Sequence, residues 1–185
     1  SIGINIAENI HTQESSIHFS HKNKFAGLAS VSTVSYIYSK LINDKQYPIY
    51  FSIINRSVND IPDTRNAMNL DGSIDYSKIE DISQQEVGLV VATIYNINHL
   101  TMGFSIKPAY TGLAEYKAWG LSGDFGLMTS LLDNRMGLGC RIENIFSFNR
   151  WDTGTMETYV PLFTAGGQIQ FKSLLLGIEA GSRLT

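Results

Sequence analysis

Long hydrophobic runs and cysteines are scarce in this chain, and each shortage excludes a class of protein. The longest apolar stretches, such as Val87–Ala92 and Leu174–Ile178, are much shorter than the roughly 20 residues of a membrane-spanning helix. Cys140 is the only cysteine among 185 residues. A single cysteine excludes an intramolecular disulfide framework and a cysteine-based metal cage.

Charge is also in short supply. Charged residues make up 17% of the chain, against about 25% in soluble domains. The net charge is −3 and the isoelectric point about 5.8, so the chain lacks the basic surface of a nucleic-acid-binding protein. The length favours one domain over residues 1–185, and nucleic acid is not an expected partner.

What the sequence does have is an alternation of apolar residues with small or polar residues, with a period of two. From Leu100 to Thr111, large apolar residues occupy the even positions, and most odd positions are small or polar. Similar alternations recur over residues 119–128, 136–143 and 174–183. A period of two predicts β-strands with one apolar face and one polar face.

The alternation predicts nine strands with unequal connections. The expected strands cover about residues 15–20, 28–40, 47–58, 86–96, 99–111, 118–130, 136–146, 159–171 and 174–184. Short connections are expected at 41–46, 96–98, 131–135 and 172–173, an intermediate one at 112–117, and long ones at Asn59–Gln85 and Ser147–Glu157. Bacterial outer-membrane barrels have short turns on one side and long loops on the other.

The length of the strands favours lipid over a protein core as the neighbour of the apolar face. Soluble strands usually have about 5–6 residues. Twelve residues extend over roughly 40 Å, which crosses a bilayer when tilted by ~40°. Aromatic residues near the expected strand ends resemble interfacial girdles: Tyr95, Tyr110, Trp119, Phe146 and Trp151. We therefore expect an all-β, antiparallel transmembrane β-barrel of the bacterial outer membrane, and the alternative is a soluble β-sandwich.

The polar face of the expected strands carries six charged residues. In a barrel this face lines the lumen. The first interpretation is a solvated wall or a ladder of ion pairs, and the second is selection of a ligand. These residues are Lys107, Asp124, Arg141, Glu143, Glu179 and Arg183.

No metal, cofactor or catalytic site is predicted. His18 and His21 are three residues apart, which places them on opposite faces of a strand. Asn69–Asp75 resembles the middle of a calcium loop, but Ala67 and Lys78 stand where its first and last carboxylates belong, which favours a solvated turn. The chain has no Gly-x-Ser-x-Gly or His-Glu-x-x-His motif. We expect a protein that is not an enzyme; an outer-membrane phospholipase or protease is the alternative.

Several motifs, in order along the chain, resemble one family. They are Val58–Arg65, Asp75–Ile79, Gly103–Lys107, Ala118–Leu127 and Trp151–Thr155. They are similar to the PorV-like branch of the FadL-type outer-membrane barrels, over most of the chain from about Ser16 onward. The resemblance implies a barrel of about fourteen strands, of which this chain covers roughly nine, so the domain is expected to be incomplete at its C-terminal end. The chain departs from the family near its N-terminus, with Asn5–Asn9 in place of an Asn-Pro-Ala-type segment.

The resemblance also implies a function. A PorV-like barrel is an accessory of type IX protein secretion, which receives exported proteins and passes them to the attachment machinery. A FadL-like barrel transports hydrophobic small molecules across the outer membrane, and this is the alternative function. The expected partners are outer-membrane lipid and proteins of a secretion or envelope complex.

The external loops are the expected partner-binding surface. Residues 59–85 contain six acidic and two basic residues, a balance that suits a protein partner better than an anionic fatty acid. The candidate residues of the two long loops are Asp60, Asp63, Arg65, Asp71, Asp75, Tyr76, Trp151 and Asp152.

Overall fold

The chain forms one antiparallel sheet. A computed structural model describes residues 15–42, 45–69, 72–132, 135–171 and 174–184. The described part has ten strands in a single sheet and two 3-10 turns, so the prediction of an all-β, antiparallel fold is confirmed. The elements are β1 (Ser16–Lys24), η1 (Phe25–Gly27), β2 (Ala29–Ile42), β3 (Lys45–Asp63), η2 (Tyr76–Lys78), β4 (Glu80–Ile97), β5 (Leu100–Leu113), β6 (Tyr116–Leu131), β7 (Met136–Trp151), β8 (Met156–Glu157), β9 (Leu162–Phe171) and β10 (Leu174–Arg183). No helix in the described residues is long and apolar enough to cross a membrane.

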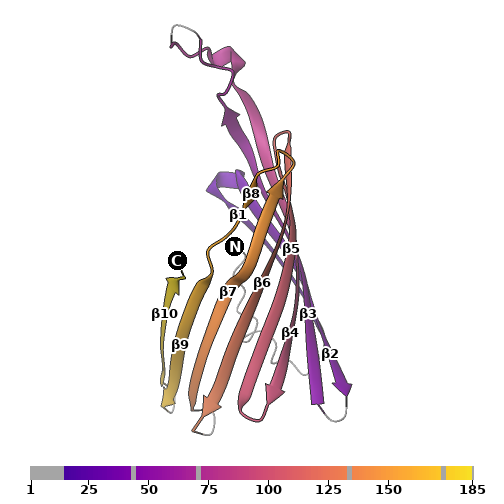
Figure 1. Ribbon diagram of the computed structural model, residues 1–185, viewed down its shortest axis with the longest axis vertical. Helices are drawn as coiled ribbons and strands as arrows, with labels where there is room; N and C mark the ends of the chain where they lie inside the picture. Colours follow the sequence, from indigo (N-terminus) through magenta and orange to yellow (C-terminus); the bar gives the residue numbers. More distant parts are fainter. Residues whose placement is uncertain (1–14, 43–44, 70–71, 133–134, 172–173, 185) are drawn as a thin grey trace.

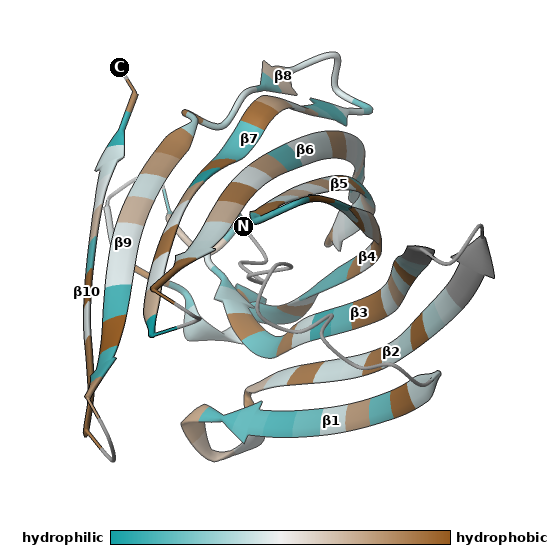
Figure 2. Ribbon diagram, turned by 90° about the horizontal axis from the view of Figure 1, so that it is seen from below, coloured by the Kyte–Doolittle hydropathy of each residue, from teal (hydrophilic) through white to brown (hydrophobic). Residues whose placement is uncertain are grey.

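Strands that follow one another in the sequence lie side by side in the sheet. The order is β1-β2-β3-β4-β5-β6-β7-β9-β10, and β8 pairs with β7. The sheet curls around a central space, which gives it a convex and a concave face (Figure 2). β1 and β10 form its two edges and do not pair with each other in the described residues. The β3–β4 hairpin extends well beyond the other strands (Figure 1).

The connections differ between the two rims of the sheet. At one rim, here called the short-turn rim, the strands are separated by only two to four residues: 43–44, 98–99, 132–135 and 172–173. At the opposite rim, the long-loop rim, the connections include residues 64–79 and the segment from 152 to 161 that contains β8. The short connections fall where the sequence predicted them.

Several strands are longer than the alternation predicted. β3 has 19 residues and β4 has 18, so the connection expected at Asn59–Gln85 shrinks to residues 64–79. β7 continues to Trp151, β8 was not predicted, and the connection expected at 112–117 is only two residues long. The apolar alternation stops where polar residues begin, but backbone pairing continues between them, as in the pair Asp63 and Glu80. Pairing of this kind leaves no trace in hydropathy.

The two faces of the sheet differ in how far their side chains are exposed. On β5, Phe104 and Ile106 are exposed and project from the convex face, whereas Ser105 and Lys107 are buried on the concave face. Residues directly opposite each other in a ladder share a face, so the register extends this assignment to the neighbouring strands. His18 and His21 then lie on opposite faces, opposite Ser35 and Ser32 respectively.

Two bulges interrupt the ladders. One lies between Val58 and Ile61 on β3. The other lies between β6 and β7, where three residues of β7 face the single residue Asp124 of β6. In each bulge a residue has a positive φ: Asp60 at 53° and Asn144 at 55°. Asp and Asn are the non-glycine residues that adopt this conformation at the lowest energetic cost.

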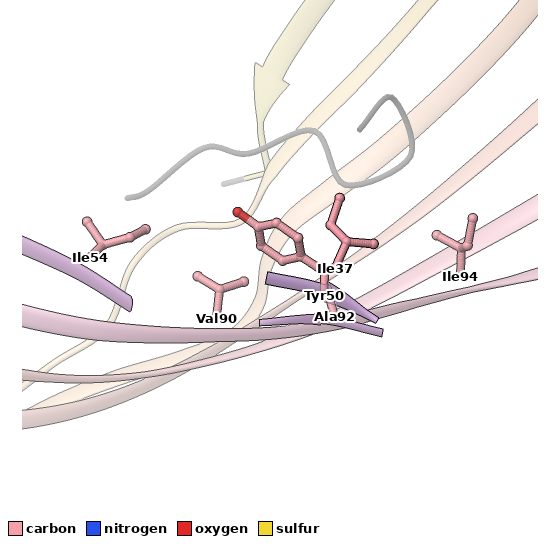
Figure 3. Close-up of a cluster of buried hydrophobic side chains, with 6 residues drawn as sticks. All are labelled: Ile37, Tyr50, Ile54, Val90, Ala92 and Ile94. Atoms are coloured by element: carbon pink, nitrogen blue, oxygen red, sulfur yellow. The ribbon is translucent and has the colours of Figure 1, made fainter. Parts of the chain in front are cut away.

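The concave face carries a cluster of six buried apolar residues. They lie on β2, β3 and β4, and none is more than 7% exposed: Ile37, Tyr50, Ile54, Val90, Ala92 and Ile94 (Figure 3). Beside them the hydroxyl of Ser35 is 2.9 Å from both Tyr50 Oη and Ser52 Oγ. The sequence predicted a polar concave face, and this holds for β5–β7 but not for β2–β4.

Candidate functional site

Two belts of aromatic side chains cross the convex face. Near the short-turn rim, Tyr47 on β3 stacks against Tyr95 on β4, with ring centroids 6.0 Å apart. Toward the long-loop rim, Tyr110 on β5 lies opposite Trp119 on β6, and the Trp119 ring meets Phe148 on β7 edge-on at 5.1 Å. Tyr95 pairs with Met102, eight residues from Tyr110 along β5. Eight residues of a strand extend ~26 Å, or roughly 20 Å across a bilayer at a tilt of ~40°.

The convex surface between the belts is apolar. In the described part of β3–β7 it carries no charged side chain. Seven of its large side chains are 38–56% exposed: Phe51, Ile53, Val87, Leu89, Phe104, Ile106 and Leu138. An apolar surface of this extent on a single sheet marks an interface with lipid or with another protein.

Of the five aromatic residues expected at strand ends, Phe146 is not at an end, and Trp151 is the last residue of β7 but does not belong to the convex belts. Phe146 is inside β7 because that strand continues to Trp151, and a Cβ added to Gly123 would lie 2.5 Å from its ring. Trp151 pairs with the buried Ala118, so it faces the concave side.

A buried ion pair organises the concave face of β5–β7. Lys107 Nζ lies 2.7 Å from Asp124 Oδ2, and Ser105 Oγ donates a hydrogen bond to the same oxygen at 3.2 Å. The backbone N–H of Asn144, in the β7 bulge, donates to Asp124 Oδ1 at 3.0 Å. Both carboxylate oxygens are therefore satisfied, which is the condition for keeping an ion pair in a buried position.

A second group of charges lies on β7 and β10. Arg141 Nε is 3.2 Å from Glu143 Oε1, although not aligned for a hydrogen bond, and its Nη2 is 3.6 Å from Glu179 Oε1. Arg183 follows Glu179 on β10 at an even spacing, so it is exposed on the same face. The six charged residues predicted from strand parity thus share the concave face. Ser105 was not identified as a partner because the alternation does not give the register between strands, and Asn144 was missed because a bulge has no signature in the alternation.

A cavity of about 350 Å³ opens beside these charges. Glycines leave the space, because the pairs Gly103–Gly126 and Gly139–Gly166 put no side chain on this part of the concave face. The polar lining comes from Asp124, Arg141, Glu143, Thr164, Gln168 and Glu179. The described residues contain no group of three or more His, Cys, Asp or Glu that could hold a metal ion. Chemically the cavity can hold a small molecule that meets both charged and apolar atoms.

Arg65 links the protruding β3–β4 hairpin to the β5–β6 turn through ion pairs. Its Nη2 lies 2.7 Å from Asp63 Oδ2, its Nη1 lies 3.0 Å from Glu115 Oε1 in the β5–β6 turn, and its guanidinium is 5.9 Å from the Tyr116 ring centroid. Hydrogen bonds from Arg65 are the main cause of the lowered pKa of both carboxyl groups, and those carboxylates raise the pKa of Arg65. Glu115 was missed by the sequence analysis because it is fifty residues away along the chain.

The described residues of the hairpin tip are hydrogen-bonded to one another and yet expose apolar side chains. Met68 and Ile74 form a β-bridge, flanked by hydrogen bonds from Asn69 N to Ser73 O at 2.9 Å and from Asp75 N to Ala67 O at 2.7 Å. Met68 is 72% exposed and Ile74 51%, although Ala67 between the strands is buried. Tyr76, in η2, is 78% exposed.

The other polar residues of the tip stabilise its own turn. The Asp75 carboxylate accepts hydrogen bonds from the Ser77 backbone and hydroxyl, and these bonds lower its pKa. Lys78 Nζ lies 3.2 Å from Asp75 and 3.1 Å from Asn69 Oδ1, so an ammonium group occupies the place a calcium ion would need. Asp71 lies outside the described residues.

The remaining loop candidates lie apart from this tip. Asp60 forms the β3 bulge. Asp152 follows β7, and its Oδ2 accepts a hydrogen bond from the Lys117 backbone N–H at 3.1 Å. The seven predicted loop residues that the structure describes therefore belong to separate places. The ion pair of Asp63 with Arg65, here called the Arg65 clamp, and the apolar tip lie on the same hairpin.

The fold and these surfaces define a class of protein: an all-β chain with a curled antiparallel sheet and its longer connections at one rim. Comparison with protein families, with curated proteins and with solved structures finds no match.

Proposed function

We propose that this chain forms part of the wall of an outer-membrane β-barrel and serves protein secretion by docking partner proteins on its external hairpin. The convex surface supports the membrane part of the proposal. A charge at the midplane of a lipid-facing barrel wall costs about 2–4 kcal/mol, and the convex face of β3–β7 has no charge between its belts. The short-turn and long-loop rims match the periplasmic and external sides of such barrels.

One observation carries the docking part: the described residues of the hairpin tip expose Met68, Ile74 and Tyr76 to solvent, next to the bridge between Met68 and Ile74. Aromatic residues and methionine are enriched in the cores of protein interfaces. Five acidic residues and only Arg65 and Lys78 lie within the described residues 60–81, so the fitting partner is a protein with an apolar pocket and a basic rim.

Tip substitutions test the docking proposal. The variant M68S/I74S/Y76S should insert into the membrane normally but lose photo-crosslinking to its partner and surface delivery of secreted cargo. The control variant F25S/L28S removes exposed apolar side chains from η1 and its C-terminal boundary, at the same rim. Equal crosslinking by the tip variant and the control would contradict the proposal.

The cavity favours a second candidate function, transport of hydrophobic small molecules. Its glycine floor and charged lining suit a molecule with an apolar body and a polar end. Shortening residues 66–79 to a tight turn separates the two functions. Loss of cargo delivery with normal uptake of hydrophobic compounds supports secretion, and the reverse result supports transport.

A further inference from the structure

The basic residues of β5–β7 differ between the two faces. On the concave face, Lys107 and Arg141 lie against carboxylates. On the convex face, Lys117 and Arg150 are exposed, and within the described part of the chain neither forms an ion pair. A buried cation needs a partner from its own protein, whereas an exposed cation can take one from its surroundings.

Lys117 and Arg150 occupy one corner of the convex face. Arg150 on β7 lies directly opposite Trp119 on β6. Lys117 is two residues from Trp119 toward the long-loop rim, so the two cations are diagonal neighbours, roughly 7–8 Å apart at the backbone. With Tyr110 they line a hollow of about 310 Å³. Asp152 also lines it, and its Oδ2 is engaged by the Lys117 backbone N–H.

The position of this corner relative to the aromatic belt indicates the ligand. Tyr110 and Trp119 belong to the belt near the long-loop rim. Tryptophan and tyrosine rings mark the boundary between hydrocarbon and headgroups, so Lys117 lies ~7 Å beyond that boundary along the strand. Arg150 starts at the belt, and its long side chain reaches toward the same level. Lipid phosphates lie at this level.

We propose that Lys117, Arg150 and Trp119 form a binding site for the phosphate of an anionic lipid in the external leaflet. The two cations contact the phosphate, and the indole and phenol rings of Trp119 and Tyr110 pack against the adjoining acyl chain. This inference rests on the proposed membrane location. Each cation near an anionic surface should enrich such a lipid about fivefold.

Tryptophan fluorescence provides the test. The chain has two tryptophans, and the variant W151F leaves Trp119 as the reporter. The protein is reconstituted in phosphatidylcholine that contains a minor fraction of either brominated phosphatidic acid or brominated phosphatidylcholine. We expect severalfold stronger quenching by the anionic lipid at equal fraction, an excess that falls as salt is raised.

Two variants and one competitor decide the outcome. In the W151F background, K117Q/R150Q should abolish the excess quenching, and K22Q/K24Q, which removes two exposed cations from β1, should retain it. Inorganic phosphate in the buffer should leave the excess unchanged; its loss would show a site for free phosphate instead. Equal quenching by the two lipids would overturn the lipid site alone. No quenching by either lipid would overturn the membrane location as well.

Discussion

Lys107 on β5 and Asp124 on β6 form an ion pair with 2.7 Å between Nζ and Oδ2, and neither side chain is more than 12% exposed. The register sets Lys107 opposite Ser122 and Asp124 opposite Ser105, so the ion pair runs diagonally across the two strands. The bulge at Asn144 completes it with a backbone hydrogen bond. Three adjacent strands are therefore linked by one carboxylate.

The first prediction concerns this ion pair. Lys107→Met should destabilise the folded protein by about 3–5 kcal/mol, because it leaves the Asp124 carboxylate buried without its cation. The double variant K107M/D124N should recover much of this loss, since Asn still offers an oxygen to the Asn144 N–H. Denaturant unfolding in detergent measures both. A double variant as unstable as the single one would show that the charge of Asp124 is not the cause.

The second prediction tests the two faces of the sheet. Phe125→Arg on the convex face should prevent assembly into a heat-modifiable barrel, at a cost of roughly 2–4 kcal/mol. Gly126→Arg on the concave face is the matched control, because a Cβ there meets its nearest atoms at an ordinary 3.7 Å. Electrophoretic mobility with and without heating reports assembly. If both variants assemble equally well, the assignment of the convex face to lipid is wrong.

The third prediction concerns Gly123 and Phe146. Gly123→Ala should destabilise the protein by about 1–3 kcal/mol, since its Cβ would lie 2.5 Å from the Phe146 ring. The double variant G123A/F146L should recover part of this loss, because the smaller side chain leaves space for the added Cβ. Unfolding midpoints of the two variants test the contact, and a neutral Gly123→Ala would show that the ring moves freely.

The fourth prediction gives the pH dependence of the Arg65 clamp. The pKa values of Asp63 and Glu115 are lowered in the folded protein, so their contribution is present above the ordinary values of 3.8 and 4.5 and is lost as pH falls through the lowered ones. Amide exchange at Arg65, whose N–H donates to Asp63, should stay slow from pH 7 to 5 and accelerate in stronger acid, after correction for intrinsic rates. The Asn69 N–H, bonded to the Ser73 carbonyl, is the control.

The fifth prediction follows from strand direction. Eight successive antiparallel pairings separate β1 from β10, so the two edge strands run the same way. An all-antiparallel barrel can close between them only with an odd number of added strands, which we expect a partner polypeptide to supply, because open edges are not tolerated in lipid. The mass of the closed barrel from native membranes should exceed 20.5 kDa. A closed monomer of 20.5 kDa would contradict this.

The sequence predicted the strands well because their apolar positions alternate strictly where one face is exposed, as at Phe104 and Ile106. The same parity put Lys107, Asp124 and Arg141 on one face. Parity could not predict which of these charges form ion pairs, because that depends on the register between strands and on the bulge at Asn144. The apolar residues on the concave face of β2–β4 were also missed. In strands that are apolar on both faces the sequence does not alternate, so it does not show that the concave face is apolar.

The bulge at Asp60 has a consequence for insertions and deletions. One extra residue on β3 reverses which positions share a face, so Ile61 and Asp63 follow the opposite parity from Val58 and the residues before it. Deleting Asp60 would therefore remove the bulge and leave Ile61 opposite Ile82 and Asp63 opposite Glu80, on the faces that they already occupy. A single deletion in the regular ladder before Val58 would instead turn the residues on one side of it onto the other face, because nothing there compensates the change of parity.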